Sequence, residues 1–457
     1  MNYTFKALSG ILSMLILVSC QSYKPLPLES KKILEEVNNS RQYDVNENFD
    51  FEQAATLMSQ RNHRLKVLQQ KYEKFQKIAA IKTPLANPEL EVGPAFGSNL
   101  EDTTASSTQP FIGIGFSIPL GPRLARNDDL NKAKELQAYN ALVIEHRKLY
   151  FELRAAYIDY MLSQQKLKAL EKVELTMQLT RKVTQKLIEI GTSTKLGFSQ
   201  VNLQLAEVKM TKLAIETEMK TALGKLSRLI SVEMGSLEKI ILKQIKLPMT
   251  HFNLQNLQKN LLNNNTSLAA IEMEFHIADQ ELKLELAKQY PDLKFGLTSE
   301  DDVGEDQRTI SVPFSIELPL FDQNRQGISA AFSERKLKLI EYKNELSNQL
   351  SFLEEEVAKY SYSRQKTTMI KNDILPLSQE NINDAEQALK LGSIGTLRYL
   401  DLLIQHQRYQ LATIDSQKQQ WEKILNLEKI SGRPIIPLSK KDSTQLKDLL
   451  KPLKVNK

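Results

Sequence analysis

The sequence predicts a mainly α fold with a membrane β-barrel portion, internally duplicated, with two long α-helical coiled-coil hairpins and four β-strands per chain. Three observations predict it. Only 16 glycines and 16 prolines occur in 457 residues, so long helices can run without interruption. Landmark residues recur at an offset of about 200 positions. Four short segments alternate apolar residues with small or polar ones, which is the period of a strand with two different faces.

The duplication rests on two pairs of landmarks. A strand-like stretch ends in Pro-Leu in both "GIGFSIPL" and "SVPFSIELPL", and Pro119 and Pro319 lie 200 residues apart (319 − 119). "LIEIGTSTKLGFSQ" aligns with "ALKLGSIGTLRYLD", where Gly191 and Gly392 lie 201 residues apart (392 − 191). Because both pairs keep nearly one offset, we expect a first repeat over 49–247 and a second over 248–432, followed by a C-terminal tail, 433–457.

The first residues predict a targeting segment rather than part of the fold. Lys6 precedes the apolar run "ILSMLILV", so residues 1–19 read as a signal peptide, too short to span a bilayer as a mature helix. Cys20, the only cysteine, ends "LVSC", which resembles a bacterial lipobox. We expect lipid attachment (palmitate) at Cys20, a lipid-anchored linker over 20–48, and outer-membrane sorting, because Gln21 rather than Asp follows. A plain signal peptide with an incidental cysteine is the alternative.

Long helices give the strongest periodic signal. Residues 126–190 contain neither Pro nor Gly, and apolar residues recur near a 3.5-residue spacing, which is typical of a coiled-coil seam. At 1.5 Å per residue such a helix is roughly 100 Å long. Helical hairpins are expected at about 123–231 and 325–431, each turning at a glycine. Pro376 should kink the second long helix or shift its hydrogen bonding.

Strands are expected at about 88–97, 109–119, 291–299 and 308–319. In each, one parity is apolar and the other small or polar, as in membrane β-barrels. The alternative is a pair of amphipathic hairpins packed on the helices of a soluble protein. Four strands cannot close a barrel, and lipid does not tolerate unpaired strand edges, so several chains would have to share one barrel.

At "NPELEVG" (87–93), "FSIPLGPRLAR" (116–126) and "ILPLSQENINDAEQALKLGSIGTLRYLDLLIQHQRYQ" (374–410), the chain resembles the TolC family of outer-membrane efflux channels. It is most similar to the metal-efflux lipoprotein branch, the CzcC/CusC type. The resemblance implies a homotrimer with a twelve-stranded barrel and an α-helical periplasmic tunnel. It also implies a passive exit duct of a tripartite efflux system, with a periplasmic adaptor and an inner-membrane pump of the RND type as expected partners.

The resemblance places the periplasmic tip, with its gate and adaptor contact, at four residues: Gly191, Gly392, Arg398 and Asp401. Arg398 and Asp401 are three residues apart and share a helical face. The first-repeat position equivalent to Asp401 is Gln200, so one acidic ring at most arises here. The alternative is structural: the glycines cap helices, and the two charges only solubilise a helix end.

Other function classes are not favoured. The five histidines show no metal-ligand spacing, no phosphate-binding glycine loop follows a strand, and the mature chain has no thiol, so we expect neither an enzyme, a cofactor nor a metal site. The net charge of +6 is spread out, which argues against nucleic acid. Helical Glu and Lys residues are expected on solvated faces. The remaining alternative is a lipid-anchored, periplasm-spanning coiled-coil structural or adaptor protein without a pore.

Overall fold

The computed structural model describes residues 23–45, 49–98, 106–191, 194–242, 245, 247, 251–302 and 307–438. The chain divides into two units, Met1–Asp44 and Val45–Lys457. The described part of the first unit contains one helix, α2 (Ser30–Arg41), with no buried residue. Cys20, residues 303–306 between the third and fourth expected strands, and the tail from residue 439 lie outside the described residues.

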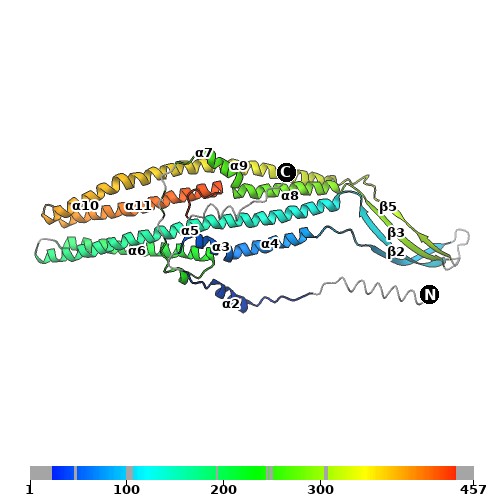
Figure 1. The fold of residues 1–457 in the computed structure, drawn as a ribbon, viewed down its shortest axis with the longest axis horizontal. Helices are drawn as coiled ribbons and strands as arrows, with labels where there is room; N and C mark the ends of the chain where they lie inside the picture. The colour runs from blue at the N-terminus through cyan, green and yellow to red at the C-terminus, as the bar shows by residue number, and fades with distance from the viewer. Residues whose placement is uncertain are drawn as a thin grey trace. The chain divides into compact units, whose positions relative to one another are not determined.

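The second unit consists of two repeats with the same order of elements (Figure 1). The first comprises α3 (Phe51–Arg61), α4 (His63–Ala80), β1 (Glu89–Ser98), β2 (Ser106–Pro119), α5 (Arg123–Glu189) and α6 (Lys195–Ile230), followed by the short η1 (Met234–Leu237). The second comprises α7 (Leu254–Asn264), α8 (Thr266–Ala287), β3 (Asp292–Asp302), β4 (Gln307–Ser311), β5 (Phe314–Ile316), α9 (Arg325–Met369), η2 (Ile370–Ile374), α10 (Leu375–Lys390) and α11 (Thr396–Ser431). The boundary expected at 247/248 adjoins undescribed residues and stays a prediction.

The duplication extends to single hydrogen bonds. Asn62 caps α4, its Oδ1 accepting from the Arg64 N–H, and its Nδ2 donates to the Leu229 carbonyl at 2.8 Å. Asn265 caps α8 in the same way, and its Nδ2 donates to the Ile430 carbonyl at 2.9 Å. Leu229 and Ile430 are 201 residues apart (430 − 229). In each repeat, one asparagine therefore starts a helix and fastens it to the end of the returning helix.

Pro376 has the effect that its chemistry predicts. The second long helix changes from α9 to the π-helical turn η2 and then to α10, which carries Pro376 near its start. Proline has no N–H and its ring crowds the preceding turn, so the backbone widens by one residue there instead of continuing as α-helix. The equivalent helix of the first repeat, α5, runs through 67 residues without such a turn.

The strands form one antiparallel sheet in the order β1-β2-β3-β4, with β5 also paired to β3. The strand expected at 308–319 is two strands, so the prediction of one continuous fourth strand is wrong. Val312 and Pro313 separate β4 from β5, and Pro313 has no N–H for the ladder, although its carbonyl accepts from the Gly296 N–H at 3.1 Å.

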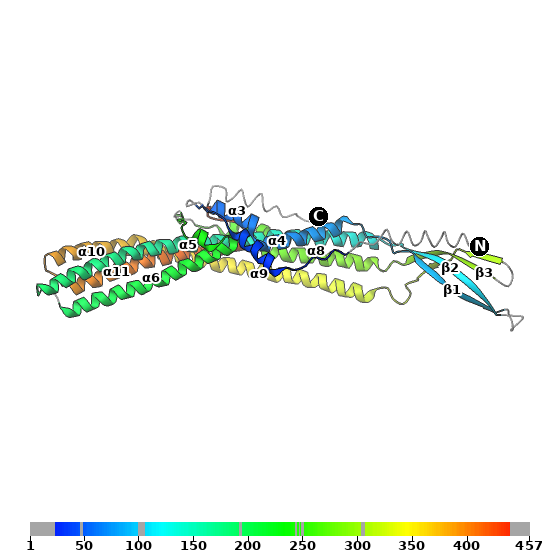
Figure 2. The ribbon, with the colours of Figure 1, turned by 90° about the horizontal axis from the view of Figure 1, so that it is seen from below.

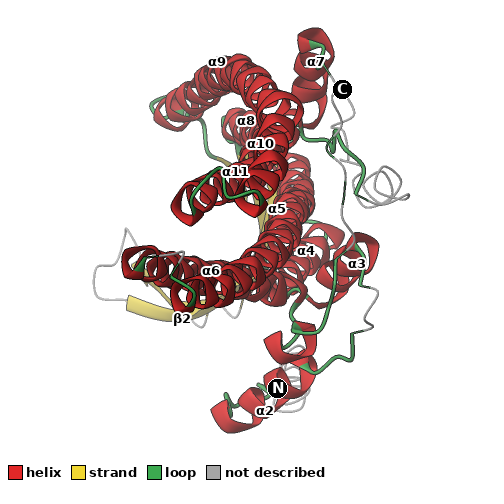
Figure 3. Cartoon of the chain, turned by 90° about the vertical axis from the view of Figure 1, so that its left-hand side faces the viewer, coloured by secondary structure: helices red, strands yellow, loops and turns green. Residues whose placement is uncertain are grey.

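The main hydrophobic core joins the two repeats. Phe51 of α3 packs edge-to-face on Tyr150 and Tyr157 of α5, with ring centroids 5.5 Å apart in both pairs. Trp421 of α11 is buried in the same cluster. Seen end-on, the helices α5, α6, α9 and α11 lie side by side in a curved arrangement (Figure 3). Among the described residues, no helix has an apolar stretch long enough to cross a membrane.

An ion pair is buried within this core. Arg154 of α5 and Glu428 of α11 are both fully buried and joined by two hydrogen bonds of 2.8 Å. Glu428 also accepts from the Ile435 and Ile436 N–H groups, and Arg154 donates to the Ile436 carbonyl at 2.6 Å. The expectation that helical Glu residues lie on solvated faces is wrong for Glu428. Its charge is compensated on every side, which is the condition for burying it.

Candidate functional site

Both helical hairpins turn at a glycine at the end of the second unit that lies opposite the sheet (Figures 1 and 2). Gly191 follows α5 with φ +75°, and Gly392 follows α10 with φ +72°. A Cβ at either position would meet no atom within 4 Å, so left-handed backbone alone requires glycine there. After Gly392, the Ser393 N–H donates to the Ala388 carbonyl at 2.9 Å, which closes the helix end.

A second hydrophobic cluster holds the two turning ends together. It combines buried residues of the first hairpin with buried residues of the second: Met177, Val201 and Leu205 with Ile382, Leu400 and Leu403. The four predicted tip residues therefore lie at one end of the fold, two of them in separate turns and two in the first turns of α11.

Arg398 and Asp401 are exposed on α11. Within the described part of one chain, neither side chain has an ion-pair partner. Gln200 of α6, the first-repeat equivalent of Asp401, is exposed as well. Unpaired charges at the end of a hairpin are available to a neighbouring chain or to another protein, so their role as gate or adaptor contact stays a prediction.

At the opposite end, the sheet has two chemically different faces. The strand register aligns apolar side chains in rows that cross the sheet. One row is Leu90, Ile114 and Leu297, a second is Phe116, Phe295 and Phe314, and a third is Ile118, Leu293 and Ile316. Phe116 and Phe295 stack with ring centroids 5.4 Å apart. Members of all three rows are exposed, Phe314 by 71 %, so this face needs an apolar environment.

The other face of the sheet is polar and small. Its rows are Glu91, Gly113, Thr298 and Ser311, and then Ser117, Lys294 and Ser315. A shallow cavity of about 160 Å³ lies on this side, lined by Glu89, Glu91, Ser117, Lys294 and Thr298 among others. Sequence alternation predicted both faces, and the register confirms that the strands align them.

Sequence reasoning missed a polar layer in the second hairpin. His406 of α11 is buried, with Nδ1 3.0 Å from the Ser378 hydroxyl of α10 and Nε2 2.7 Å from the Gln410 amide nitrogen. Further along, the Thr367 and Ser416 hydroxyls lie 2.5 Å apart. A usable signal existed, because the repeat offset of 201 residues aligns Ser378, His406 and Ser416 with apolar residues of the first hairpin.

A second buried histidine, His146, also has a structural role. His146 of α5 is buried with Nε2 2.8 Å from the Ser59 hydroxyl of α3, and burial lowers the pKa of His146 to about 4. Among the described residues, no three His, Cys, Asp or Glu side chains are grouped so that they could hold a metal ion.

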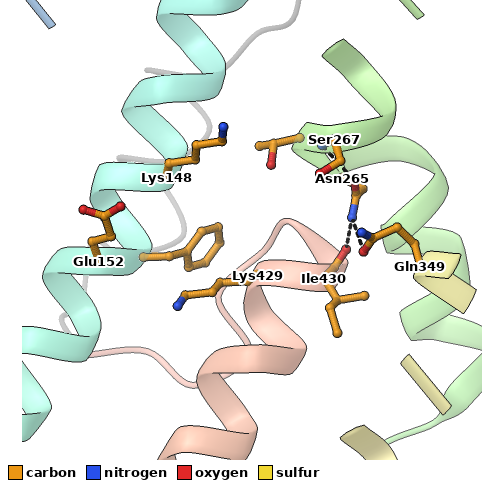
Figure 4. Close-up of a pocket in the computed structure, with 9 residues that line it drawn as sticks. Lys148, Glu152, Asn265, Ser267, Gln349, Lys429 and Ile430 are labelled. Carbon is orange, nitrogen blue, oxygen red and sulfur yellow. Dashed lines mark hydrogen bonds between the residues drawn. The ribbon is translucent and has the colours of Figure 1, made fainter. Parts of the chain in front are cut away.

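A cavity of about 320 Å³ lies where the two repeats meet, between α5, α8, α9 and α11. Lys148 and Lys429 line it, together with Asn265, whose amide nitrogen bonds to the Ile430 carbonyl and to Gln349 Oε1 (Figure 4). Both lysines are exposed and Glu152 lies beside them, so the cavity is an open polar recess rather than an enclosed binding site.

Comparison with known proteins agrees with this architecture, although no protein-family model matches the chain. The chain is 23 % identical over 328 residues to the cobalt-zinc-cadmium resistance protein CzcC of Cupriavidus metallidurans, covering 69 % of this chain and 74 % of CzcC. Its structure is similar to the outer-membrane channel OprN (TM-score 0.70, 15 % identity, 90 % of this chain and 98 % of OprN). It is also similar to CusC, whose structures concern transmembrane channel formation (TM-score 0.65, 15 % identity, 90 % and 99 %).

The structural similarities cover about nine tenths of this chain and nearly the whole of each compared protein. The fold that the resemblance to the TolC family implies is thus confirmed: this chain has the fold of the outer-membrane channel OprN and of CusC.

Proposed function

We propose that the chain is the passive exit duct of a tripartite efflux system in the outer membrane. The observation that carries the proposal is the sheet: an exposed apolar face lies at one end of two long helical hairpins. Water would not tolerate three adjoining apolar rows, whereas the hydrocarbon core of a bilayer would.

Closure of the sheet requires more than one chain. Among the described residues, the outer edges of β1 and of β4 and β5 have no strand partner. In lipid each backbone group must be satisfied, so these edges would pair with neighbouring copies. With β4 and β5 counted as one interrupted strand, a homotrimer would supply about twelve strand positions, above the minimum of about eight for common membrane barrels.

The helical hairpins would then continue the barrel as a tunnel into the periplasm. Their turning ends, with Gly191, Gly392, Arg398 and Asp401, would meet a periplasmic adaptor, and an inner-membrane pump of the RND type would supply the energy. Acylation at Cys20 would add a lipid anchor in the outer membrane. The metals in the name of the Cupriavidus relative make divalent cations the first cargo to test.

The lipid-anchored rod without a pore is not favoured. A coiled-coil rod does not require a sheet with one apolar and one polar face. The fold is also similar to outer-membrane channels over most of the length of the chain. Migration on a gel with and without heating separates the two readings, because a barrel oligomer resists detergent until heated and a coiled-coil rod does not.

Conductance of the purified oligomer in a planar bilayer tests the proposal. We expect discrete openings from the wild type, and larger or more frequent openings from the Arg398→Ala/Asp401→Ala double variant, because paired charges between neighbouring chains would hold the tip closed. The matched control is Gln200→Ala, at the equivalent position of the first repeat, which should behave as wild type.

Each outcome has a consequence. If the double variant opens as the wild type does, the proposed duct stands, but Arg398 and Asp401 do not form its gate. No openings from a correctly assembled oligomer would overturn the duct itself and favour the rod.

A further inference from the structure

The two hairpins differ in the chemistry of their seams. The offset of 201 residues aligns Ser378 with Met177 (378 − 201), His406 with Leu205 (406 − 201) and Ser416 with Ile215 (416 − 201). All six side chains are buried. The seam of the first hairpin is thus apolar where that of the second is polar. Apolar packing stabilises a seam whatever the exact orientation of its side chains, whereas a buried polar layer is stable only while its hydrogen bonds are satisfied.

The hydrogen bonds to His406 favour its neutral form. With the Gln410 amide nitrogen beside Nε2, Nε2 accepts that hydrogen bond, and Nδ1 then carries the proton, which it donates to the Ser378 hydroxyl. A second proton would have to bind at Nε2, where it would place two donors 2.7 Å apart. The neutral ring closes the layer, and the charged ring breaks it or forces the Gln410 amide to turn.

Among the residues that the structure describes, no charged group pairs with His406 to compensate a protonated ring. Burial is the sole cause of the lowered pKa of His406. Titratable side chains on the helices packed here are exposed or paired with one another, as Glu174 is with Lys212 at 2.9 Å. Within about one turn of the level of His406, counting from Gly191 and Gly392, they are Glu174 and Arg181 of α5, Glu207 and Lys209 of α6, Glu380 of α10, and Arg408 and Tyr409 of α11, the Tyr409 hydroxyl accepting from the Gln405 amide.

The second hairpin is also the one whose long helix is interrupted. The π-turn η2 lies between the two polar contacts, after Thr367 and before Ser378. A hairpin with an irregular turn and buried polar contacts opens locally at lower free energy than one whose long helix is uninterrupted and whose aligned positions are apolar.

We propose that α10 and α11 form a proton-sensitive catch, in which neutral His406 keeps the hairpin packed and protonation of its ring loosens it. His406 acts here as a positioning residue for α10. The link from a loosened hairpin to opening of the duct rests on the proposed function.

The sign of the effect follows from linkage. The closed hairpin holds His406 neutral, while an opened hairpin exposes the ring and lets it take up a proton near the ordinary histidine pKa of about 6.5. Stability of the closed hairpin is therefore full above that value and is lost as the pH falls below it. One proton changes the opening equilibrium by at most about tenfold per pH unit.

Hydrogen exchange of the full-length oligomer at about pH 7.5 and about pH 5.5, on either side of that pKa, tests the catch. After correction for intrinsic exchange rates, we expect amides of α10 and of the first half of α11 to lose protection at the lower pH, and amides of α5 and α6 near Gly191 to keep it. His406→Gln should remove the loss. Gln410→Glu should reverse it, because a carboxylate beside the ring stabilises the charged form.

His276→Gln is the control, since His276 lies in α8, outside the hairpin, and burial also lowers its pKa. It should leave the response of α10 and α11 unchanged. A wild-type hairpin whose protection does not depend on pH, or a His406→Gln variant that keeps the full response, would overturn the proposal.

Bilayer conductance separates this proposal from the duct. Acidification on the side of the helical turns should make wild-type openings more frequent, with no change in His406→Gln. Openings whose frequency does not depend on pH would overturn the proton-sensitive catch but not the proposed duct. An oligomer without openings would overturn the duct, and hydrogen exchange would then decide on the hairpin by itself.

Discussion

At the residue scale, the buried ion pair of Arg154 and Glu428 connects α5 to α11 and to the segment that follows α11. Replacing Glu428 with Gln removes a charge that Arg154 needs, and leaves a buried guanidinium uncompensated. We expect this variant to lose about 3–5 kcal/mol of unfolding free energy, the range for breaking a buried pair. Denaturant unfolding of the purified oligomer, followed by the fluorescence of buried Trp421, measures the loss.

A surface pair provides the comparison. Arg64 pairs with Glu145 but its side chain is 58 % exposed, so Arg64→Ala should cost about 0–1 kcal/mol. Equal losses for Glu428→Gln and Arg64→Ala would contradict the assignment of a structural role to the buried pair.

These residues show what the sequence could not reveal. Arg154 and Glu428 are separated by 274 positions, and each lies in a helix rich in other charged residues. Helical periodicity places a side chain on a face, but which face another segment covers depends on packing between the repeats. Asp401 and Arg398 are the opposite case, because a turn glycine followed by a helix start locates them directly.

At the scale of elements, three glycines end helices with left-handed backbone, and only one of them is crowded. Gly191, Gly392 and Gly432 have φ between +67° and +75°. A Cβ at Gly432 would collide with the Asn264 carbonyl, whereas the other two would meet nothing within 4 Å. We expect Gly191→Ala and Gly392→Ala each to cost about 1–2 kcal/mol, and Gly432→Ala clearly more, because a backbone clash adds to the strain.

Thermal unfolding of the three variants, compared with wild type under one condition, checks this order. Equal shifts for all three would mean that the contact between Gly432 and Asn264 relaxes without cost. The sequence predicts Gly191 and Gly392 as helix ends, whereas the close approach at Gly432 arises because Asn264 ends α7 of the same repeat beside it.

At the scale of the whole molecule, the two faces of the sheet require different surroundings, lipid for the apolar face and a polar environment for the other. Leu297 is 51 % exposed in one of the apolar rows, and Thr298 is its neighbour on the polar face. Leu297→Lys should destabilise the membrane-inserted oligomer by about 2–4 kcal/mol, because the charge would face lipid. Thr298→Lys should be tolerated, because it would face the same side as Glu91.

Heat-modifiable gel migration of both variants in membranes measures the difference. If Thr298→Lys were lost from the membrane and Leu297→Lys retained, the apolar face would point inwards, and the proposed barrel would be wrong.

The sequence by itself determined the duplication, the long helices, the glycine turns, the effect of Pro376 and the alternation of the strands. Each is a local property, fixed by periodicity or by the backbone chemistry of one residue. The tertiary structure decided the burial of Glu428 and the polar layer around His406. These depend on which segments meet, and repeats that look alike in sequence bury different side chains because burial is set by partners distant along the chain.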